Sequence, residues 1–424
     1  MHGLKFFRQR CADESFEVQE CVEEYSAAAS VSERAVGGDW IVVERMIEMR
    51  DDRLKLDHIE LKGFKSIPPA GQLIDFGYTT VLLGANGSGK SNLVSFFRFL
   101  NYLTTHGLQV FIEKQGQSDA MLHYGSKHTD KLEFSVNMVA GADGNRKKTT
   151  YQARMVHGMP DRLFFTSEKI SYYGAGKETP YEYFIESANG ESGLDADSRQ
   201  TSRVVHGALS GIRAYQFHDT SDTARIKKST YIEDCKYLRS DAGNLAAFLY
   251  ALSVNEKKYY ERIVRHICKI MPQFKDFDLS PGISNPNNIM LNWYDIHGET
   301  LFGPHQISDG SLRFMALATL LLQPPAMIPG VLVIDEPELG LHPAAIAELA
   351  GMIKTASKYS QIIVATQSTR LVDEFGVEDI IVVERDENSH GSVFRRLDSK
   401  QLAEWLERYS VSELWEKNVL GGQP

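Results

Sequence analysis

Two short runs of residues have the types and spacing needed to bind a phosphate chain and to activate water beside it. The first, residues 84–91 (GANGSGKS), fits the phosphate-binding pattern G-x-x-x-x-G-K-[ST] at every position. Glycines in such a loop let backbone N–H groups face phosphate oxygens, while Lys90 is expected to reach the β- and γ-phosphates and the Ser91 hydroxyl to bind Mg²⁺. The residues predicted to contact a nucleotide are Gly84, Asn86, Gly87, Ser88, Gly89, Lys90, Ser91 and Asn92.

The second run, residues 331–338 (VLVIDEPE), predicts a buried strand that delivers carboxylates at its C-terminal end, where ligands bind in open α/β sheets. Asp335 suits the outer sphere of Mg²⁺. Glu336 suits a general base that polarises water, a role that typically contributes a factor of about 10²–10⁴ in rate. Alone, this run could be a strand that ends in a solvated acidic turn. Together with the phosphate loop it favours a catalytic pair.

The elements that must position these residues flank them in the sequence. Residues 78–83 predict a strand that enters the phosphate loop, and residues 91–100 predict an amphipathic helix that leaves it, which places phosphate at a helix N-terminus. A third polar run, residues 307–313 (ISDGSLR), precedes an apolar helix predicted over 314–322. Ser308 offers a capping oxygen there, and Gly310 removes a side chain where another group must approach closely.

In combination, these runs resemble those of ABC-type ATPases of the RecF, SMC and OLD-like branch. SDGS at 308–311 resembles their signature motif, where S-G-G is commoner, DEPELGLHP at 335–343 resembles their Walker B and D-loop segment, and 59–67 resembles their opening strand. The resemblance implies an α/β head: a first lobe with mixed and antiparallel strands, and a parallel core sheet. It also implies ATP and Mg²⁺ as cofactors, and a head-to-tail dimer in which Ser308 and Gly310 complete the partner's site.

One position departs from the family pattern. After the apolar run at 361–366 the family usually has T-H-S, whereas this chain has Thr366-Gln367-Ser368. The Gln367 amide can donate a hydrogen bond to a γ-phosphate oxygen but cannot carry a proton charge. Gln367 is therefore expected to assist a slow turnover or, alternatively, to cap the strand end. The glutamine of the family's Q-loop is not identifiable by pattern, and the candidates are Gln115, Gln117 and Gln216.

The chain is predicted to have five parts. They are an N-terminal extension (1–50), a first ATPase lobe (51–172), an insertion or lid (173–300), a second lobe (301–385) and a C-terminal tail (386–424). Alternating runs at 131–139, 149–156 and 162–166 predict antiparallel strands in the first lobe, with Asp143-Gly144 as a hairpin turn. The insertion shows no sustained heptads, so we expect a compact lid with helices within 241–272, without a long coiled coil.

Composition is that of a globular protein in a reduced cytoplasm. Of 424 residues 42% are hydrophobic and 24% charged, no apolar run reaches the roughly 18 residues of a membrane span, and four dispersed cysteines form no zinc pattern. The formal charge of −10 argues against a surface that binds nucleic acid all over. The cationic runs 146–148 and 225–228 are either local patches or solvated loops.

Two further segments leave alternatives open. Residues 217–221 (FHDTS) could support nucleophilic or metal chemistry, or form a turn held by Asx and Ser/Thr hydrogen bonds. In the tail, an amphipathic pattern over 402–409 predicts a helix that either packs onto its own lobe or docks a partner.

No second catalytic motif accompanies the ATPase motifs, and about forty residues after the last predicted strand are too few for a nuclease domain of ~100 residues. The resemblance implies a homodimer or higher oligomer that regulates a separately encoded effector, a nuclease or toxin, in bacterial antiphage defence, with no membrane partner. A repair or end-sensing ATPase that binds duplex DNA is the alternative. A transporter subunit fits less well because of the D-loop sequence and the large insertion.

Overall fold

The computed structural model describes residues 54–141, 147–174, 179–187, 190–282, 285–298, 300–387 and 389–422. Contacts divide the chain into two units, Met1–Asp51 and Asp52–Pro424, and the fold described below belongs to the second unit. The predicted extension at 1–50 and the Asp143-Gly144 turn lie outside the described residues.

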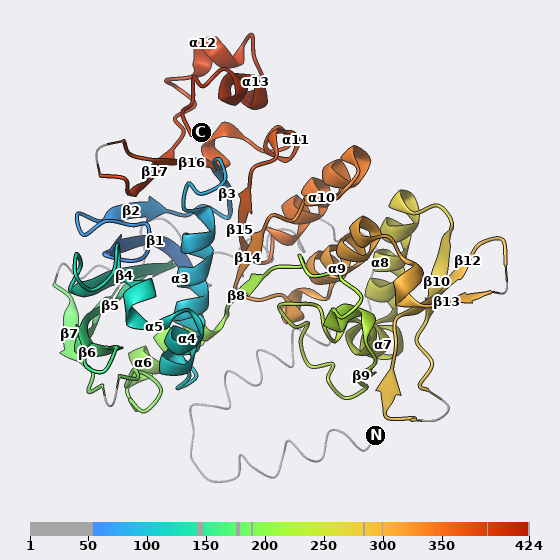
Figure 1. The fold of residues 1–424 in the computed structure, drawn as a ribbon, viewed down its shortest axis with the longest axis horizontal. Helices are drawn as coiled ribbons and strands as arrows, with labels where there is room; N and C mark the ends of the chain where they lie inside the picture. The colour runs from blue at the N-terminus through green and yellow to red at the C-terminus, as the bar shows by residue number, and fades with distance from the viewer. Residues whose placement is uncertain are drawn as a thin grey trace. The chain divides into compact units, whose positions relative to one another are not determined.

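A six-stranded core sheet has the strand order β17-β16-β3-β15-β14-β8 (Figure 1), and the phosphate loop and the acidic pair lie at the ends of β3 and β14. All its neighbouring pairs are parallel except β16 with β17. Every residue of β3, β14 and β15 is buried, which explains why their sequences are mainly apolar. The strands are β3 (Thr79–Leu83), β8 (Ile212–Tyr215), β14 (Val331–Asp335), β15 (Gln361–Thr366), β16 (Ile380–Arg385) and β17 (Ser392–Arg396).

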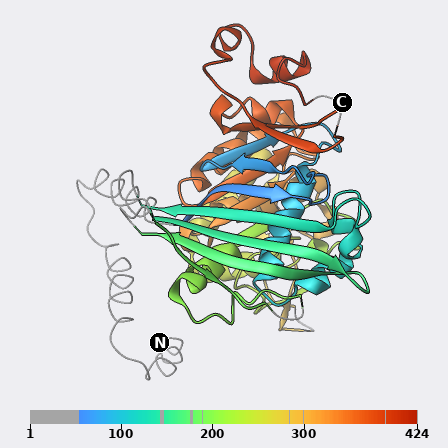
Figure 2. The same cartoon turned by 90° about the vertical axis from the view of Figure 1, so that its left-hand side faces the viewer.

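A second six-stranded sheet, fully antiparallel, forms the first lobe in the order β2-β1-β4-β5-β6-β7 (Figure 2). Helix α3 (Lys90–Leu103) buries Phe96, Phe97 and Phe99 in the apolar cluster that this sheet shares with one face of the core sheet. The strands are β1 (Lys55–Lys62), β2 (Gln72–Asp75), β4 (Lys131–Ala140), β5 (Lys147–Gly158), β6 (Arg162–Tyr173) and β7 (Tyr181–Phe184), and the helices beside α3 are α4 (Leu108–Lys114), α5 (Gln117–Met121) and α6 (Gln200–Ser210).

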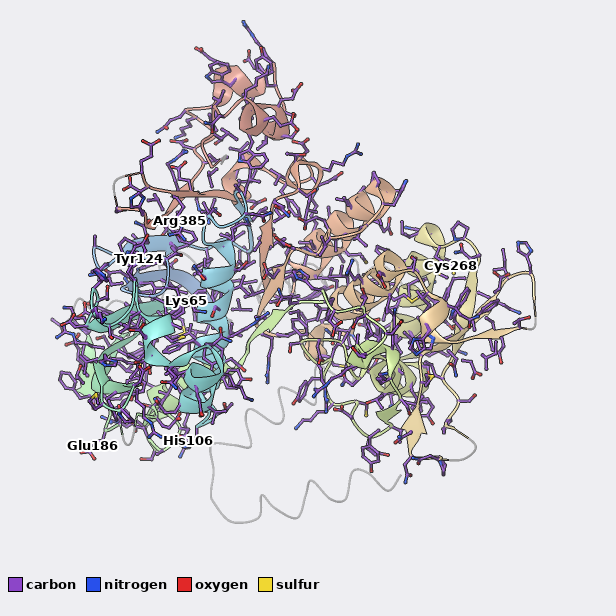
Figure 3. All side chains as sticks on the ribbon, viewed as in Figure 1. Lys65, His106, Tyr124, Glu186, Cys268 and Arg385 are labelled. Carbon is purple, nitrogen blue, oxygen red and sulfur yellow. The ribbon has the colours of Figure 1, made fainter. Side chains whose placement is uncertain are left out.

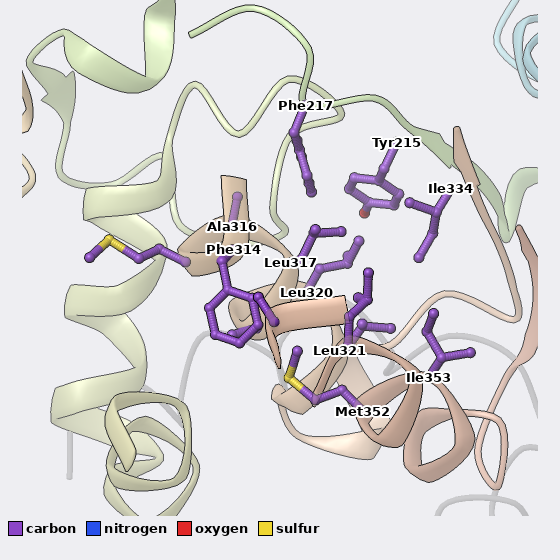
Figure 4. Packing of buried hydrophobic residues seen from close by; sticks show 14 of the residues in the cluster. Tyr215, Phe217, Phe314, Ala316, Leu317, Leu320, Leu321, Ile334, Met352 and Ile353 are labelled. Carbon is purple, nitrogen blue, oxygen red and sulfur yellow. The ribbon is translucent and has the colours of Figure 1, made fainter. Parts of the chain in front are cut away.

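Helices cover the other face of the core sheet. Apolar side chains of α9 and α10 pack with Tyr215, Phe217 and Ile334 (Figure 4). Helices form within 241–272 as predicted, and Leu245, Phe248, Leu249 and Leu252 of the first of them are buried. The elements are α7 (Leu245–Asn255), α8 (Lys257–Ile270), α9 (Asp309–Leu322), α10 (Pro343–Ala356) and α11 (Thr369–Val372), with short strands β9 (Thr230–Tyr231), β10 (Phe274–Asp278), β11 (Asn288–Ile289), β12 (Asn292–Asp295) and β13 (Leu301–Phe302).

Residues 173–300 contribute to more than a lid. Strand β7 pairs with β6 of the first lobe, and β8 pairs in parallel with β14 of the core sheet. Only part of this range therefore lies outside the two sheets. The predicted α/β class is confirmed: the first-lobe sheet is antiparallel, the core sheet is parallel except at β17, and the described part of the chain has no long coiled coil.

The tail differs from the single helix predicted over 402–409. Two short helices form instead, α12 (Ala403–Leu406) and α13 (Val411–Glu416), because Ser410 caps a new helix by accepting from the Glu413 N–H. Leu414 is fully buried, whereas Trp405 is 47% exposed. The tail ends at the phosphate loop, where the Ala85 N–H donates to the Gly422 carbonyl (3.0 Å). No helix of the described residues is long and apolar enough to span a membrane.

Candidate functional site

The phosphate loop connects β3 to α3 and is shaped by glycines at close contacts. Gly87 and Gly89 have left-handed backbone angles (φ 79° and 117°), which favour glycine. A Cβ at Gly89 would overlap the Ser392 hydroxyl, and one at Gly84 would overlap the Val383 carbonyl. Arg385 supports the loop from β16, since its Nε donates to the Gly87 carbonyl (3.0 Å; Arg385 is labelled in Figure 3).

Lys90 lies buried in this loop, as the first residue of α3. Its Nζ donates to the carbonyls of Gly84 (2.6 Å) and Ala85 (2.9 Å). Burial lowers the pKa of Lys90, and the nearby carboxylates of Glu336 and Asp335 partly offset that effect. The cation is therefore placed between the loop and the acidic strand end.

The other predicted loop residues are divided between exposed and buried positions. Asn86, Gly87 and Ser91 are exposed, so their backbone and hydroxyl groups are accessible to a ligand. The Ser88 hydroxyl is buried and has no hydrogen-bond partner in the described part of the chain. Asn92 points elsewhere: its Nδ2 donates to the Ser66 hydroxyl (2.7 Å) and so ties α3 to the segment after β1.

The acidic pair lies at the carboxyl edge of the core sheet beside the loop. Register places Asp335 opposite Ala365, and Thr366 opposite Leu83, so the ends of β14, β15 and β3 meet at one edge. Asp335 is buried, and burial, followed by the charge of Glu336, raises its pKa. Its Oδ1 has no partner among the described residues.

These groups fit Mg²⁺. A buried carboxylate oxygen without a partner and an exposed serine hydroxyl are the hard oxygen ligands that Mg²⁺ takes from a protein when substrate phosphates supply others. Ser91 and Asp335 are the residues in question.

Glu336 has a left-handed backbone (φ 44°), which is uncommon for a residue with a side chain and is a form of strain found at functional sites. Its N–H donates to the Ala365 carbonyl (2.8 Å), and its carboxylate Oε2 lies 3.9 Å from the Nε2 of His218. The turn thereby holds the carboxylate beside the sheet edge and opposite a histidine.

The structure distinguishes the three candidate glutamines. The Gln216 Nε2 donates to the Asp335 Oδ2 (3.3 Å), and its Oε1 accepts from the Arg98 guanidinium (2.9 Å). Gln115 is exposed and accepts from Lys65, and Gln117 is exposed at the start of α5. Only Gln216, directly after β8, touches the acidic pair.

The segment after β8 forms the hydrogen-bonded turn that was one of the two alternatives for residues 217–221. Ser221 donates through its N–H (3.1 Å) and hydroxyl (2.7 Å) to Asp219, which is a turn held by side-chain hydrogen bonds. Phe217 is buried in the apolar core (Figure 4). His218, in contrast, lies against Glu336, and its Nε2 is buried with no hydrogen-bond partner in the described part of the chain.

Gln367 lies at the end of β15 and is partly exposed. Its N–H is 3.4 Å from the Glu338 Oε1, which also accepts from the Thr366 hydroxyl (2.5 Å). Glu338 is a residue that sequence reasoning missed. It is buried, and burial raises its pKa.

The signature residues begin α9. Ser308 caps the helix by accepting from the Ser311 N–H (3.2 Å) and is itself exposed. A Cβ at Gly310 would overlap the Gly340 carbonyl, so this glycine permits the contact between the helix start and the segment after the acidic pair.

Asp309 stands where the family more often has glycine, and it has a partner. Its carboxylate lies 3.5 Å from the Nζ of Lys227, which is buried. The cationic run 225–228 is thus not a fully solvated loop, since its central lysine reaches the signature motif.

Arg313, one turn further along α9, joins the separate segments. It donates to the carbonyls of Phe217 (3.1 Å) and His218 (3.0 Å), to the Thr220 hydroxyl (3.1 Å) and to the Leu339 carbonyl (3.2 Å). One guanidinium therefore connects the signature helix, the segment after β8 and the segment after Glu338.

Comparison with known proteins supports this assignment of fold. Residues 211–373 match the protein family described as "AAA domain, putative AbiEii toxin, Type IV TA system". No curated protein matches the chain.

Two solved structures share the fold. One is an SmcHead bound to the C-winged helix domain of ScpA (18% identity, TM-score 0.53, covering 82% of this chain and 99% of that one). The other is an Smc head domain with an extended coiled coil, bound to the C-terminal domain of ScpA and derived from Pyrococcus furiosus (18%, 0.51, 84% and 99%). The chain thus has the fold of a P-loop ATPase head of the SMC type, and the family match supports an ATP-binding ATPase.

Proposed function

We propose that this chain is an ATP-binding and ATP-hydrolysing switch whose site is completed by a second copy of the chain. The observation that supports it best is the meeting of Lys90, Asp335 and Glu336 at one sheet edge, where buried polar atoms of Ser88 and Asp335 have no partner among the described residues. Such atoms are costly to leave unpaired, so a ligand that supplies partners would stabilise the site.

In this proposal Lys90 leaves the loop carbonyls and binds the β- and γ-phosphates. Ser91 and Asp335 hold Mg²⁺, which when bound neutralises charge on those phosphates. Gln216 orients Asp335 through their hydrogen bond. Glu336 polarises the attacking water, with His218 beside its carboxylate, and Gln367 donates to the γ-phosphate from the neighbouring strand.

The second copy enters through the signature. Ser308 is exposed and its hydroxyl is part of a helix start, which is where anions bind. We infer that Ser308 and the Gly310 N–H contact the γ-phosphate held by the partner. Charge-assisted bonds of this kind contribute about 1.5–3 kcal/mol each, and a two-fold dimer contains them twice.

We further propose that this switch controls a separately encoded effector, with antiphage defence as its setting. The family description names a toxin system, and the SMC heads of similar fold were solved with a bound partner protein. The exposed Trp405 of the tail is a suitable anchor for such a partner. The free cysteines Cys235 and Cys268 fit a reduced cytoplasm.

Phosphate release and nucleotide binding by the purified chain test the proposal. Lys90→Ala should weaken ATP binding at least about tenfold, because it removes charge-assisted hydrogen bonds. Glu336→Gln should bind ATP but hydrolyse it about 10²–10⁴ times more slowly. Glu261→Gln is the matched control, since Glu261 is exposed on α8 and should leave the rate unchanged. Turnover of Glu336→Gln at the wild-type rate would show that another group is the base.

A further inference from the structure

A groove of about 670 Å³ lies beside the candidate nucleotide site, between the first lobe and the segment after β8. Its walls come from α3, α4, β8 and residues 225–241, and its charged side chains are Arg98, Lys114, Arg213, Arg225, Arg239 and Asp241. Five of these six charged side chains are cationic, which is unusual because the formal charge of the whole chain is −10. The groove volume lies within the roughly 300–1,000 Å³ of small-molecule sites.

Several of these cations have no acidic partner. Within the described part of the chain no carboxylate pairs with Arg98, Lys114 or Arg213, whereas Arg239 pairs with Asp234 (2.8 Å). Lys114 and Arg213 are also exposed. Like charges gathered without counter-charges raise the local potential, which attracts anions.

Aromatic rings line the same groove. Tyr102 and Tyr237 are 39% and 54% exposed. The Arg213 guanidinium lies 5.3 Å from the centroid of the Tyr237 ring. Exposed tyrosines next to arginines are suited to stacking a base while the cations hold the attached phosphates.

The groove is connected to the nucleotide site by hydrogen bonds. Arg98 lines the groove and donates to Gln216 (2.9 Å), and Gln216 donates to Asp335 (3.3 Å). An anion that draws Arg98 away would free the Gln216 carbonyl oxygen and alter the support of Asp335.

We propose that this groove binds phosphorylated nucleotide units, with phosphates on Arg98, Lys114 and Arg213 and a base on Tyr237, and that its occupancy changes ATP turnover through Gln216. The binding claim is independent of the proposed function, and only the effect on turnover rests on it. A small signalling oligonucleotide and a single-stranded nucleic acid both present phosphates and bases to the groove. The two probes described below distinguish these ligands.

Binding is measured on the full chain carrying Lys90→Ala, so that the phosphate loop contributes little. The probes are fluorescein-labelled linear diadenylate and a fluorescein-labelled 20-nucleotide oligothymidylate, followed by anisotropy. Lys114→Glu and Arg213→Glu should each weaken binding at least about tenfold, because each turns an attraction for phosphate into a repulsion. Lys358→Glu is the matched control: this exposed lysine lies outside the groove, and the change in net charge is the same.

Stacking is tested at Tyr237. Tyr237→Ala should weaken probe binding about tenfold, because it removes the ring on which a base stacks, whereas Tyr237→Phe keeps the ring and should bind as the parent does. Thermal unfolding of every variant verifies that it is folded.

Each outcome decides the proposal. Binding of both probes identifies a site open to small nucleotides, and binding of the 20-nucleotide probe alone identifies a strand. Absence of binding by either probe at millimolar concentration, or equal weakening by Lys358→Glu, overturns the site. In the chain with Lys90 intact, the bound probe should change ATP turnover at least about twofold. Probe binding without any change in ATP turnover would disprove the coupling through Gln216, while the groove would still be a binding site.

Discussion

The two halves of the candidate nucleotide site are built differently. The phosphate-loop half consists of consecutive residues, and its supporting contacts from Ser392 and Arg385 reach mainly the loop backbone. The other half brings together segments far apart in the chain, which Arg313 joins through hydrogen bonds to Phe217, His218 and Leu339. A local motif can bind phosphate by itself, whereas the dispersed half depends on tertiary contacts and can transmit a change between segments.

The largest expected effect that separates the halves comes from Arg313→Lys. Lysine keeps the charge but cannot present the planar fork that reaches several acceptors at once. Loss of one or two hydrogen bonds at about 0.5–1.5 kcal/mol each predicts an ATP turnover about twofold to a hundredfold lower, with ATP affinity nearly unchanged. Turnover and ATP titration measure the two quantities.

Arg370→Lys is the matched control for that substitution, since Arg370 is exposed on α11. If Arg313→Lys weakens ATP binding as strongly as it lowers turnover, the phosphate-loop half does not bind ATP independently of the dispersed half.

A smaller effect is expected at Gln367, whose neutral amide contributes a hydrogen bond of about 0.5–1.5 kcal/mol. Gln367→Ala should lower turnover by no more than about tenfold and leave binding intact. Gln367→His restores the residue usual in the resembled family and should hold or raise the rate. Complete loss of activity in Gln367→Ala would assign this residue a larger role than a γ-phosphate donor.

The Lys227–Asp309 pair tests how the dispersed half holds the signature. Asp309→Asn should destabilise the chain by roughly 1 kcal/mol, because Lys227 is buried while Asp309 is half exposed and partly screened. The loss should shrink in a Lys227→Met background, as chemical denaturation of the double-mutant cycle can measure.

Asp222→Asn is the control for the pair, since Asp222 is 91% exposed and lies 3.9 Å from the same Lys227 nitrogen. Equal losses at both aspartates would mean that the Lys227–Asp309 pair does not anchor the signature.

The smallest effect concerns pH. Burial raises the pKa of Glu338 above its usual 4.5, so the folded chain binds this proton more tightly than the unfolded chain. The ionised carboxylate therefore costs stability, and the cost grows as pH rises from about 4.5 through the raised folded pKa. Without nucleotide, Glu338→Gln should raise the melting temperature at pH 7, and the gain should disappear below pH 4.5. A gain independent of pH would contradict this assignment.

The sequence predicted the phosphate loop, β3, α3, β14 and β15 closely because buried parallel strands are continuous apolar runs and the loop is local. It did not identify Gln216, because β8 has only four residues and Arg213 within it is exposed. It gave Glu338 no role, because an acid after Asp335 and Glu336 looks solvated until β15 covers it. The pairing of Asp309 with Lys227 joins positions far apart in the sequence, which no local pattern encodes.

In the proposed function, ATP joins two copies of the chain through the signature. The Gly310→Glu substitution that the motif suggests is unsuitable, because any side chain at Gly310 would overlap the Gly340 carbonyl within one chain. Ser308→Asp is better: aspartate caps a helix as well as serine does, yet it adds a carboxylate against the incoming γ-phosphate. Ser308→Asn is its neutral, cap-preserving control.

Light scattering of the Glu336→Gln chain with and without ATP tests this claim most directly. ATP should double the particle mass of Glu336→Gln alone and with Ser308→Asn, whereas the chain with Ser308→Asp should bind ATP and keep the mass of a single chain. A mass that ATP leaves unchanged in Glu336→Gln, or a mass that doubles equally with Ser308→Asp, would contradict it.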